Sequence, residues 1–424
     1  MKSRKSLCPL LLLVALMIGS ISYAQQYDLL IKGGHLIDPK NNIDSVMDIA
    51  ITGDRIAAVE SNIPPGQANR VIDATGLYVS PGLVDLHAHV FYGTEPNASY
   101  SNGYSAIPPD GFTFRSGVTT VVDVGGAGWR NFPQFKQQVI DRVRTRVLAF
   151  LNIVGSGMKG GPVEQNLNDM DPKLTAMRIL EYPQILVGIK AAHYMGPEWD
   201  PVDRAVKAGE IANVPVMVDF GRNDPPLSLE ALLLKHLRPG DILTHTYAHV
   251  SGREPIVGEN GKVKPFVFKA RERGLIFDVG HGGGSFLFRQ AIPALQQGFP
   301  PDSMGTDIHV GSMNGGMKDM LNVASKFLNL GMSLKDVVAA STWKPAQIIN
   351  RPDLGHLGVG AEADLAVINL RSGNFGFIDV GNGRFDGTQK LECELTLRSG
   401  RVVWDLNGLA APKWDEMNRE ISSR

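Results

Sequence analysis

The chain has 424 residues, and 43 acidic against 42 basic side chains give it a formal net charge of −1. This balance excludes a role that depends on a strongly basic surface, such as binding nucleic acid through bulk charge. Hydrophobic residues make up 43% of the chain and charged residues 20%, so it is neither disordered nor fibrous. At roughly 150 residues per domain, the length predicts two or three domains, or one large α/β barrel with additions.

Residues 1–24 have the features of a secretory signal peptide. Basic residues within the first five positions are followed by an apolar run over 10–18, and small residues precede the expected cleavage site, Ala24–Gln25. The apolar run is shorter than the ~20 residues that a membrane-spanning helix needs, which disfavours a retained anchor. We therefore expect an exported protein, secreted or periplasmic, that has no membrane anchor once the signal is removed.

Cysteine usage narrows the metal chemistry that is open to the chain. Cys8 lies in the predicted signal peptide, which leaves Cys393 as the single cysteine of the mature protein. One thiol forms neither an intrachain disulfide nor a cysteine-rich zinc site. Any metal must therefore be held by histidine and carboxylate side chains.

Short alternating strands are predicted at both ends of the mature chain. Residues 27–80 alternate apolar and polar positions between Gly, Asn and Asp turns, and this pattern returns at 363–370 and 392–405. We expect the two ends to pair in one small β-sandwich. The predicted boundaries are 25–80 and 353–410 for the sandwich and 411–424 for a C-terminal tail.

The middle of the chain alternates short apolar strands with longer amphipathic stretches, such as DPKLTAMRILEYP and LSLEALLLKHL. Eight strand candidates are found at 82–90, 117–125, 146–155, 185–193, 214–221, 241–249, 275–281 and 303–309. Eight such units predict a (β/α)₈ TIM-like barrel over residues 81–352, a fold of typically ~250 residues. A doubly wound sheet is the alternative, but it does not explain why polar residues recur at the carboxyl ends of so many strands.

Those polar residues are the candidate functional groups. In strand order they are His87, His89, Lys190, His193, Asp219, His245, His281 and Asp307. In a (β/α)₈ barrel all of these strand ends open onto one face, where active sites lie. The remaining histidines His35, His236 and His356 lie elsewhere, and we expect them to be solvated or structural.

The spacing and chemistry of His87 and His89 are enough to predict that both are metal ligands. Side chains at positions i and i+2 of a strand point to the same side, so the two imidazoles converge. Neutral imidazole is a common zinc ligand, and a site of histidine and carboxylate suits Zn²⁺, Mn²⁺ or Fe²⁺. Lys190 is flanked by apolar residues, and such a lysine is costly unless it is paired or chemically altered. A salt bridge from Lys190 to Asp307 or Asp219 is one way to pair it.

Motifs along nearly the whole mature chain resemble those of a known superfamily. They are VSPGLVDLHAHV, GVTTVVD, VGIK, LTHTYAH, FDVGHGGGSF, GTDIH and STWKPAQIINRPDLGHLGVGAEADLAVINL. With them the chain resembles the amidohydrolase superfamily, and within it the deacetylase-type metallohydrolases near dihydroorotase and D-aminoacylase. The resemblance implies a metal-dependent hydrolase that cleaves an N-acyl or cyclic amide, or an ester, with a metal-activated hydroxide.

The resemblance also implies roles for individual residues. Lys190 is expected to be carboxylated by CO₂ and to bridge two metal ions, with His245 as a ligand of the second. Asp307 is expected to bind the first ion and to act as the proton shuttle. His281 is expected to contact substrate.

Two further residues just past strand ends are candidates for holding a substrate carboxylate. They are His193 and Arg222. Arg222 is the better candidate because a guanidinium binds a carboxylate through two hydrogen bonds.

The fifth strand departs from the pattern of the superfamily. Close relatives usually carry a histidine there, whereas this chain has Asp219 in VPVMVDFGRN. Aspartate also ligates zinc through oxygen, so we favour a binuclear site with Asp219 as a ligand. The alternative is one divalent ion, with Asp219 paired to Lys190 or Arg222.

Three other functions stay open beside a general amide hydrolase. A dihydroorotase-like cyclic amidase is disfavoured by export, because pyrimidine synthesis is a cytosolic pathway, and a D-aminoacylase is a second alternative. A non-catalytic barrel that serves as a binding module is disfavoured by the complete set of expected ligands. The expected partner is a small-molecule substrate, and a homo-oligomer is compatible with the fold.

Overall fold

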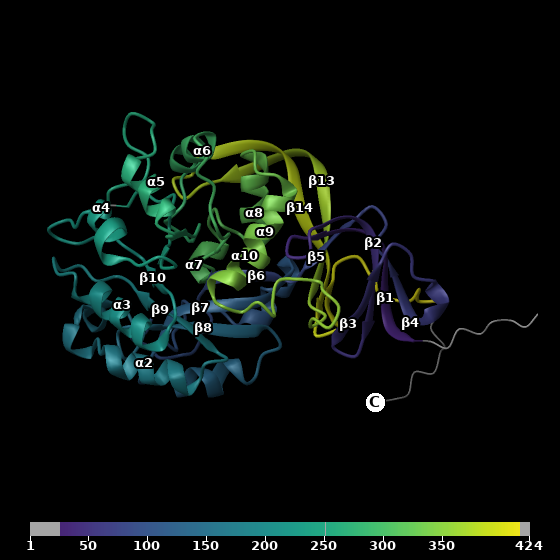
Figure 1. Cartoon of the computed structure of the whole chain (residues 1–424), viewed down its shortest axis with the longest axis horizontal. Helices are drawn as coiled ribbons and strands as arrows, with labels where there is room; N and C mark the ends of the chain where they lie inside the picture. Colours follow the sequence, from purple (N-terminus) through teal and green to yellow (C-terminus); the bar gives the residue numbers. More distant parts are fainter. Residues whose placement is uncertain (1–25, 251, 416–424) are drawn as a thin grey trace, which may run out of the picture.

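The computed structural model describes residues 26–250 and 252–415. The predicted signal peptide, with Cys8 and the site Ala24–Gln25, lies outside the described residues. Within the described part, no helix is long and apolar enough to cross a membrane. Two β-sheets organise this part of the chain, one on each side of the molecule (Figure 1).

The first sheet combines strands from both ends of the chain. Its strands follow the order β15-β14-β13-β5-β1-β2-β3, and β4 pairs with β1. Their bounds are β1 Tyr27–Asp38, β2 Ile43–Thr52, β3 Arg55–Glu60, β4 Ala68–Asp73, β5 Tyr78–Pro81, β13 Leu365–Ile378, β14 Arg384–Arg398 and β15 Arg401–Asp405. Because β5 pairs with β1 on one side and with β13 on the other, the two chain ends share one sheet. The sandwich form of this region stays a prediction.

The second sheet is parallel throughout and has seven strands in chain order. They are β6 Leu83–Ala88, β7 Val118–Gly128, β8 Arg146–Asn152, β9 Leu186–Ala191, β10 Val216–Val218, β11 Ile242–Leu243 and β12 Ile276–Phe277. Each falls within a segment predicted as a strand or overlaps it. The eighth predicted segment makes isolated parallel bridges to both sides of the sheet, Asp278 with Ser303 and Ala88 with Ile308.

Helices follow most of the parallel strands and surround the second sheet (Figure 1). Their bounds are α1 Phe132–Phe135, α2 Pro172–Glu181, α3 Asp200–Ala212, α4 Leu229–Ala231, α5 Pro265–Glu272, α6 Phe288–Gln296, α7 Val310–Met313, α8 Met320–Asn329, α9 Leu334–Ser341 and α10 Trp343–Ile348. The helix predicted in DPKLTAMRILEYP is α2, which begins with a proline and is capped by Asp171 accepting from two backbone amides. The segment LSLEALLLKHL forms α4 and then a π-helical turn.

Apolar residues cover both faces of the parallel sheet. Every residue of β6, β7 and β9 is buried, which is typical of parallel strands packed between other elements. One buried cluster joins residues of six strands to α10, and a larger cluster joins the strands to the remaining helices. The sheet is therefore a rigid base, and its carboxyl ends carry the polar residues described below.

A network of four charged side chains connects the two sheets. Arg146, at the start of β8, pairs with Glu362 and donates to Asp364 at 2.8 Å. Arg398, at the end of β14, pairs with the same two carboxylates. All four side chains are largely buried, so removing one leaves buried charge with fewer partners.

We predict that Arg146→Ala lowers the free energy of unfolding by about 2–4 kcal/mol, because Glu362 and Asp364 then share one arginine. Chemical denaturation measures the change. The matched control is Arg384→Ala, which removes an exposed ion pair with Asp386 and should cost less than about 0.5 kcal/mol. Equal losses in the two variants would contradict the proposed link between the sheets.

Candidate active site

A cavity of about 500 Å³ lies at the carboxyl ends of the parallel strands. Its lining includes five residues predicted from the sequence, namely His193, Asp219, Arg222, His245 and Asp307. Tyr100, Glu164, His309 and the segment 283–285 also contribute to the wall. A volume of this size suits a small-molecule substrate.

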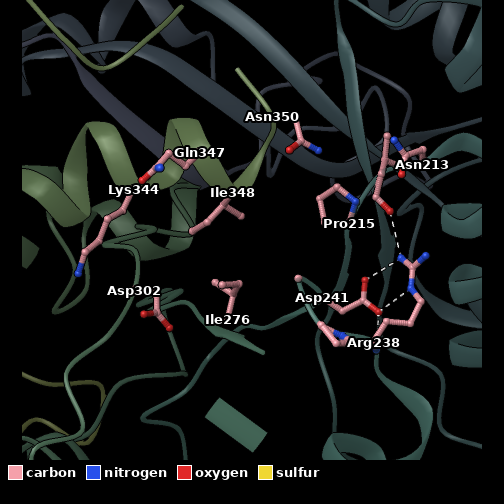
Figure 2. Close-up of a pocket in the computed structure, with 13 residues that line it drawn as sticks. Asn213, Pro215, Arg238, Asp241, Ile276, Asp302, Lys344, Gln347, Ile348 and Asn350 are labelled. Carbon is pink, nitrogen blue, oxygen red and sulfur yellow. Dashed lines mark hydrogen bonds and ion pairs between the residues drawn. The ribbon is translucent and has the colours of Figure 1, made fainter. Parts of the chain in front are cut away.

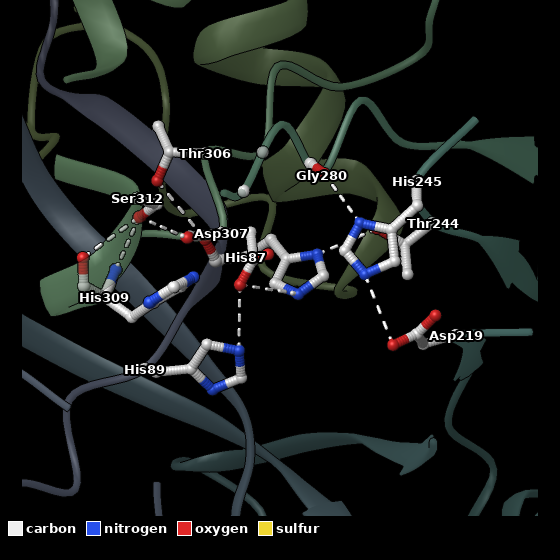
Figure 3. A network of polar contacts seen from close by, with 12 residues as sticks. His87, His89, Asp219, Thr244, His245, Gly280, Thr306, Asp307, His309 and Ser312 are labelled. Carbon is white, nitrogen blue, oxygen red and sulfur yellow. Dashed lines mark hydrogen bonds and ion pairs between the residues drawn. The ribbon is translucent and has the colours of Figure 1, made fainter. Parts of the chain in front are cut away.

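His87, His89 and Asp307 converge beside this cavity (Figure 3). The Oδ1 atom of Asp307 lies 3.0 Å from His89 Nε2 and 3.7 Å from His87 Nε2. One ligand atom from each residue lies within 4.8 Å of the other two, and all three residues are buried. Among the described residues this trio is the one group whose ligand atoms meet that spacing, and its donor set fits a divalent metal ion.

His87 is held in the orientation that a metal ligand needs. Its Nδ1 lies 2.8 Å from Thr244 Oγ1 and 3.2 Å from Asp278 Oδ2, so its Nε2 faces Asp307. Burial, followed by the positive charge of Lys190, lowers the pKa of His87 to about 3. The imidazole is therefore neutral at pH 7, with a carboxylate on the ring nitrogen opposite the ligand atom, as is common for metal-binding histidines.

Asp278 is a functional residue that the sequence reasoning missed. It is fully buried and accepts hydrogen bonds from Ser303 Oγ at 2.5 Å and from the Gly305 amide at 3.0 Å, as well as facing His87. The sequence could have indicated this residue, because Asp278 is a carboxylate within the apolar segment LIFDVGH, three residues before His281.

Lys190 stands on β9 with 1% of its surface exposed. Its Nζ lies 3.5 Å from His87 Nε2 and 3.6 Å from Met217 Sδ. Burial lowers its pKa, which favours the neutral amine. The salt bridge to Asp307 or Asp219, considered as an alternative role, is not among the contacts of Nζ in the described structure.

Asp219, His193 and His245 form a second group at the cavity wall. The Oδ2 atom of Asp219 lies 3.3 Å from His193 Nε2 and 3.4 Å from His245 Nε2. Burial opposes a charged His193, but hydrogen bonds with Asp219 and Glu164 outweigh it and raise the pKa of His193 to about 10. Burial likewise opposes ionisation of Asp219, and the two imidazoles nevertheless hold its pKa well below the usual range.

The backbone at the site adopts uncommon conformations. His193, Arg222, His245 and Asp307 all have φ between 53° and 65°, the left-handed region. Such residues persist only where the surroundings fix them, and they cluster at active sites. Each of these four residues follows a parallel strand, or in the case of Asp307 the eighth segment, so the chain turns sharply at the cavity.

His281 is not brought together with the other candidates. It is fully buried, its Nε2 accepts from Lys326 Nζ at 2.7 Å, and its Nδ1 faces the Gly282 carbonyl at 3.0 Å. The ring stacks on Phe286. Both ring nitrogens are occupied by these partners, and His281 is not among the residues that line the cavity, so the geometry does not support the predicted contact with substrate. Gly282 lies against Asp307, because a Cβ there would be 2.2 Å from Asp307 Oδ2.

A second cavity of about 550 Å³ lies at the opposite, amino-terminal ends of β10, β11 and β12 (Figure 2). Arg238 in its wall is already paired with Asp241 and donates to the Val214 carbonyl. This cavity brings together none of the predicted site residues. The first cavity is therefore the candidate active site.

We predict a pH effect from Lys326, whose pKa burial lowers to about 7. A lysine with a lowered pKa in the folded state binds fewer protons there than in the unfolded chain between about pH 7 and 10. The stability of the native chain relative to Lys326→Met should therefore increase with pH across this window, by at most ~1.4 kcal/mol per pH unit.

Unfolding at several pH values measures this difference. Lys207→Met, at an exposed position of α3, is the matched control and should show no such slope. If the difference in the free energy of unfolding between the native chain and Lys326→Met did not change with pH, the buried amine would keep its charge and the prediction would be wrong.

The chain is similar to known proteins of one enzyme family. Residues 288–403 match the Amidohydrolase family. The chain is 35% identical to a deacetylase of Agrobacterium fabrum over 343 residues, which cover 78% of this chain and 80% of that protein. Among solved structures it is similar to an adenine deaminase (TM-score 0.79, 28% identity, 90% of this chain and 100% of that chain). A dihydroorotase is similar as well (TM-score 0.77, 30% identity, 89% of this chain and 99% of that chain).

Proposed function

Because this chain belongs to the amidohydrolase family and is a hydrolase of amide or other C–N bonds, we propose that it is an exported, metal-dependent enzyme that hydrolyses N-acyl or cyclic amides. The observation that carries the proposal is the convergence of His87, His89 and Asp307 beside the cavity. The similarity to a deacetylase over most of both chains favours an N-acyl substrate, and an acyl ester is the variant of the same chemistry. The barrel is proposed to close through the segment 303–308, which bridges both sides of the parallel sheet.

The donor set of the first trio fits a divalent cation, with zinc as the first choice. The Nε2 atoms of His87 and His89 both face Asp307 Oδ1, and a shared cation satisfies this arrangement. When bound, the ion supplies a hydroxide nucleophile near neutral pH and polarises the substrate carbonyl. Lys190 is buried and has no carboxylate partner among the described residues, and it is proposed to carry a carboxyl group from CO₂ and to support a second ion.

Hydrolysis adds one water across the acyl–nitrogen bond. The water oxygen bonds to the carbonyl carbon, the C–N bond breaks, and a carboxylic acid and an amine leave. Asp307 takes a proton from the water and delivers it to the departing nitrogen. Burial opposes ionisation of Asp307, yet His87 and His89 hold its pKa below the usual range, so the group is a carboxylate at neutral pH.

Arg222 is the proposed partner of a substrate carboxylate. It lies in the cavity wall with its side chain exposed, and a guanidinium matches a carboxylate with two donors. His193 also lines the cavity, but both of its ring nitrogens face carboxylates of the protein. A dihydroorotase-like cyclic amide and a D-aminoacyl substrate are the alternatives that the same cavity accommodates.

We predict that Asp307→Asn lowers kcat by at least ~10³-fold, because the amide can neither take the proton nor bind the ion as a carboxylate. The test is a metal-loaded activity screen over N-acetyl amino acids of both hands, hydantoins, dihydroorotate and acyl esters. Asp386→Asn, an exposed carboxylate outside the cavity, is the control and should keep full activity. Undiminished hydrolysis by Asp307→Asn would overturn the mechanism.

Carboxylation of Lys190 predicts a mass increase equal to one CO₂ in the native protein. The adduct should disappear on acidification and should be absent from Lys190→Met, because a carbamate loses CO₂ in acid. Native mass spectrometry in bicarbonate buffer makes this measurement. An unmodified lysine in the fully metal-loaded enzyme would exclude the carboxylated form.

A further inference from the structure

One helix on the surface exposes a stripe of large apolar side chains. It is α2, in which Leu174 is 38% exposed, Met177 65% and Leu180 57%. A single exposed apolar residue is normal on a protein surface. Among the described residues, however, α2 is the one helix that exposes three large apolar side chains. A contiguous apolar stripe of this kind is typical of an interaction surface.

The three side chains share one face of the helix. At about 100° per residue, positions 174, 177 and 180 fall within a sector of about 120° whose centre is Met177. Lys173 and Glu181 are exposed as well. Each of these two lies four residues from Met177, and therefore about 40° from its direction. The exposed face thus has an apolar centre, with a basic group at one end and an acidic group at the other.

This face is open in the part of the molecule that the structure describes. Figure 1 shows α2 at the lower edge of the molecule, outside the parallel strands. A hollow of about 550 Å³ lies beside the helix, and Trp129, just past the end of β7, lines it together with the three apolar side chains of α2. Apolar surface that is left in water costs free energy, so a partner that covers this hollow gains from its burial.

The residues of this face are symmetric about Met177. The positions three before and three after it are both leucine, and the positions four before and four after it carry opposite charges. A two-fold axis through Met177 places a second copy of the helix antiparallel to the first. Leu174 then meets Leu180 of the partner subunit. Lys173 likewise meets Glu181 of the partner subunit, and the symmetry repeats each pair.

Both charged groups are available for such a contact. Lys173 makes no ion pair within the part of the chain that the structure describes. Glu181 pairs with Arg178 of its own helix at 2.5 Å, but 51% of its side chain is exposed, and a carboxylate accepts from more than one donor. A parallel pairing of the two helices would instead set Lys173 against its own copy. Charge therefore favours the antiparallel arrangement.

We propose that this face of α2 is the contact between two copies of the chain, packed antiparallel about a two-fold axis at Met177. The proposal is independent of the hydrolysis proposed above, because the active-site cavity is lined by other residues. A contact centred on one helix about 15 Å long is smaller than the standard protein interface of ~1,600 Å². The dimer is therefore expected to be weak, with a dissociation constant of about 1–100 µM.

The test is sedimentation velocity of the mature protein at concentrations that span this range. The native chain should change from monomer to dimer as its concentration rises. Met177→Glu places two like charges at the two-fold axis, so the dissociation constant should rise at least ~100-fold. The matched control is Val359→Glu, which changes an exposed apolar residue in the loop before β13 and should dimerise as the native chain does. The melting temperature checks that both variants are folded.

Charge reversal tests the register of the two helices. Lys173→Glu should raise the dissociation constant about 10-fold, because both ion pairs become repulsive. Adding Glu181→Lys to the same chain reverses both members of each pair, so the dissociation constant should return toward its native value. This rescue is specific to the antiparallel dimer, because an unrelated protein or a lipid surface carries no residue that reverses together with Glu181.

A native chain that stays monomeric above about 100 µM would contradict the proposal, as would a dimer that Met177→Glu leaves unchanged. If the double charge reversal did not restore the dimer, the antiparallel register would be wrong. A native chain that stays monomeric and binds lipid vesicles, with binding lost in Met177→Glu, would show that a membrane surface covers α2 in place of a second copy.

Discussion

Burial of ionisable groups away from water is the constraint on which the rest of this structure depends. His87, His89, Lys190 and Asp307 are all buried within one small region at the end of a parallel sheet. An isolated buried charge is expensive, so such a group is stable only when its neighbours share charge, protons or a cation with it. Burial lowers the pKa of both Lys190 and His87, which favours the neutral form of each nitrogen base beside one carboxylate.

Three further buried carboxylates hold the backbone around these groups. Asp85 accepts from the amides of Thr306 and His87, so it joins the first parallel strand to the eighth segment. Asp123 accepts from the amides that follow His89, and Asp278 faces the His87 ring. The ligand atoms are thus fixed through the main chain as well as through side-chain packing, which is how a rigid sheet positions a reactive group.

Local patterns were enough to predict the main elements. A parallel strand that is buried on both faces has a continuous run of apolar residues. Such runs in the sequence predicted the positions of the seven strands of the second sheet. The eighth segment, 303–309, forms only isolated bridges, and the left-handed Asp307 interrupts its extended backbone. In LSLEALLLKHL the apolar period predicted a helix, and the structure has a short helix that widens into a π-helical turn.

The sequence by itself determined that His87 and His89 share a side of a strand and that acidic and basic groups end its neighbours, because alternation in a strand is a local rule. The tertiary structure alone decided which of those groups meet. It buried His281 against Lys326, and it set Glu164 behind His193 from a short 3₁₀ helix that carries no periodic signal. Such contacts join residues far apart in the chain, and their distances follow from the packing of helices and loops around the sheet, which no local pattern encodes.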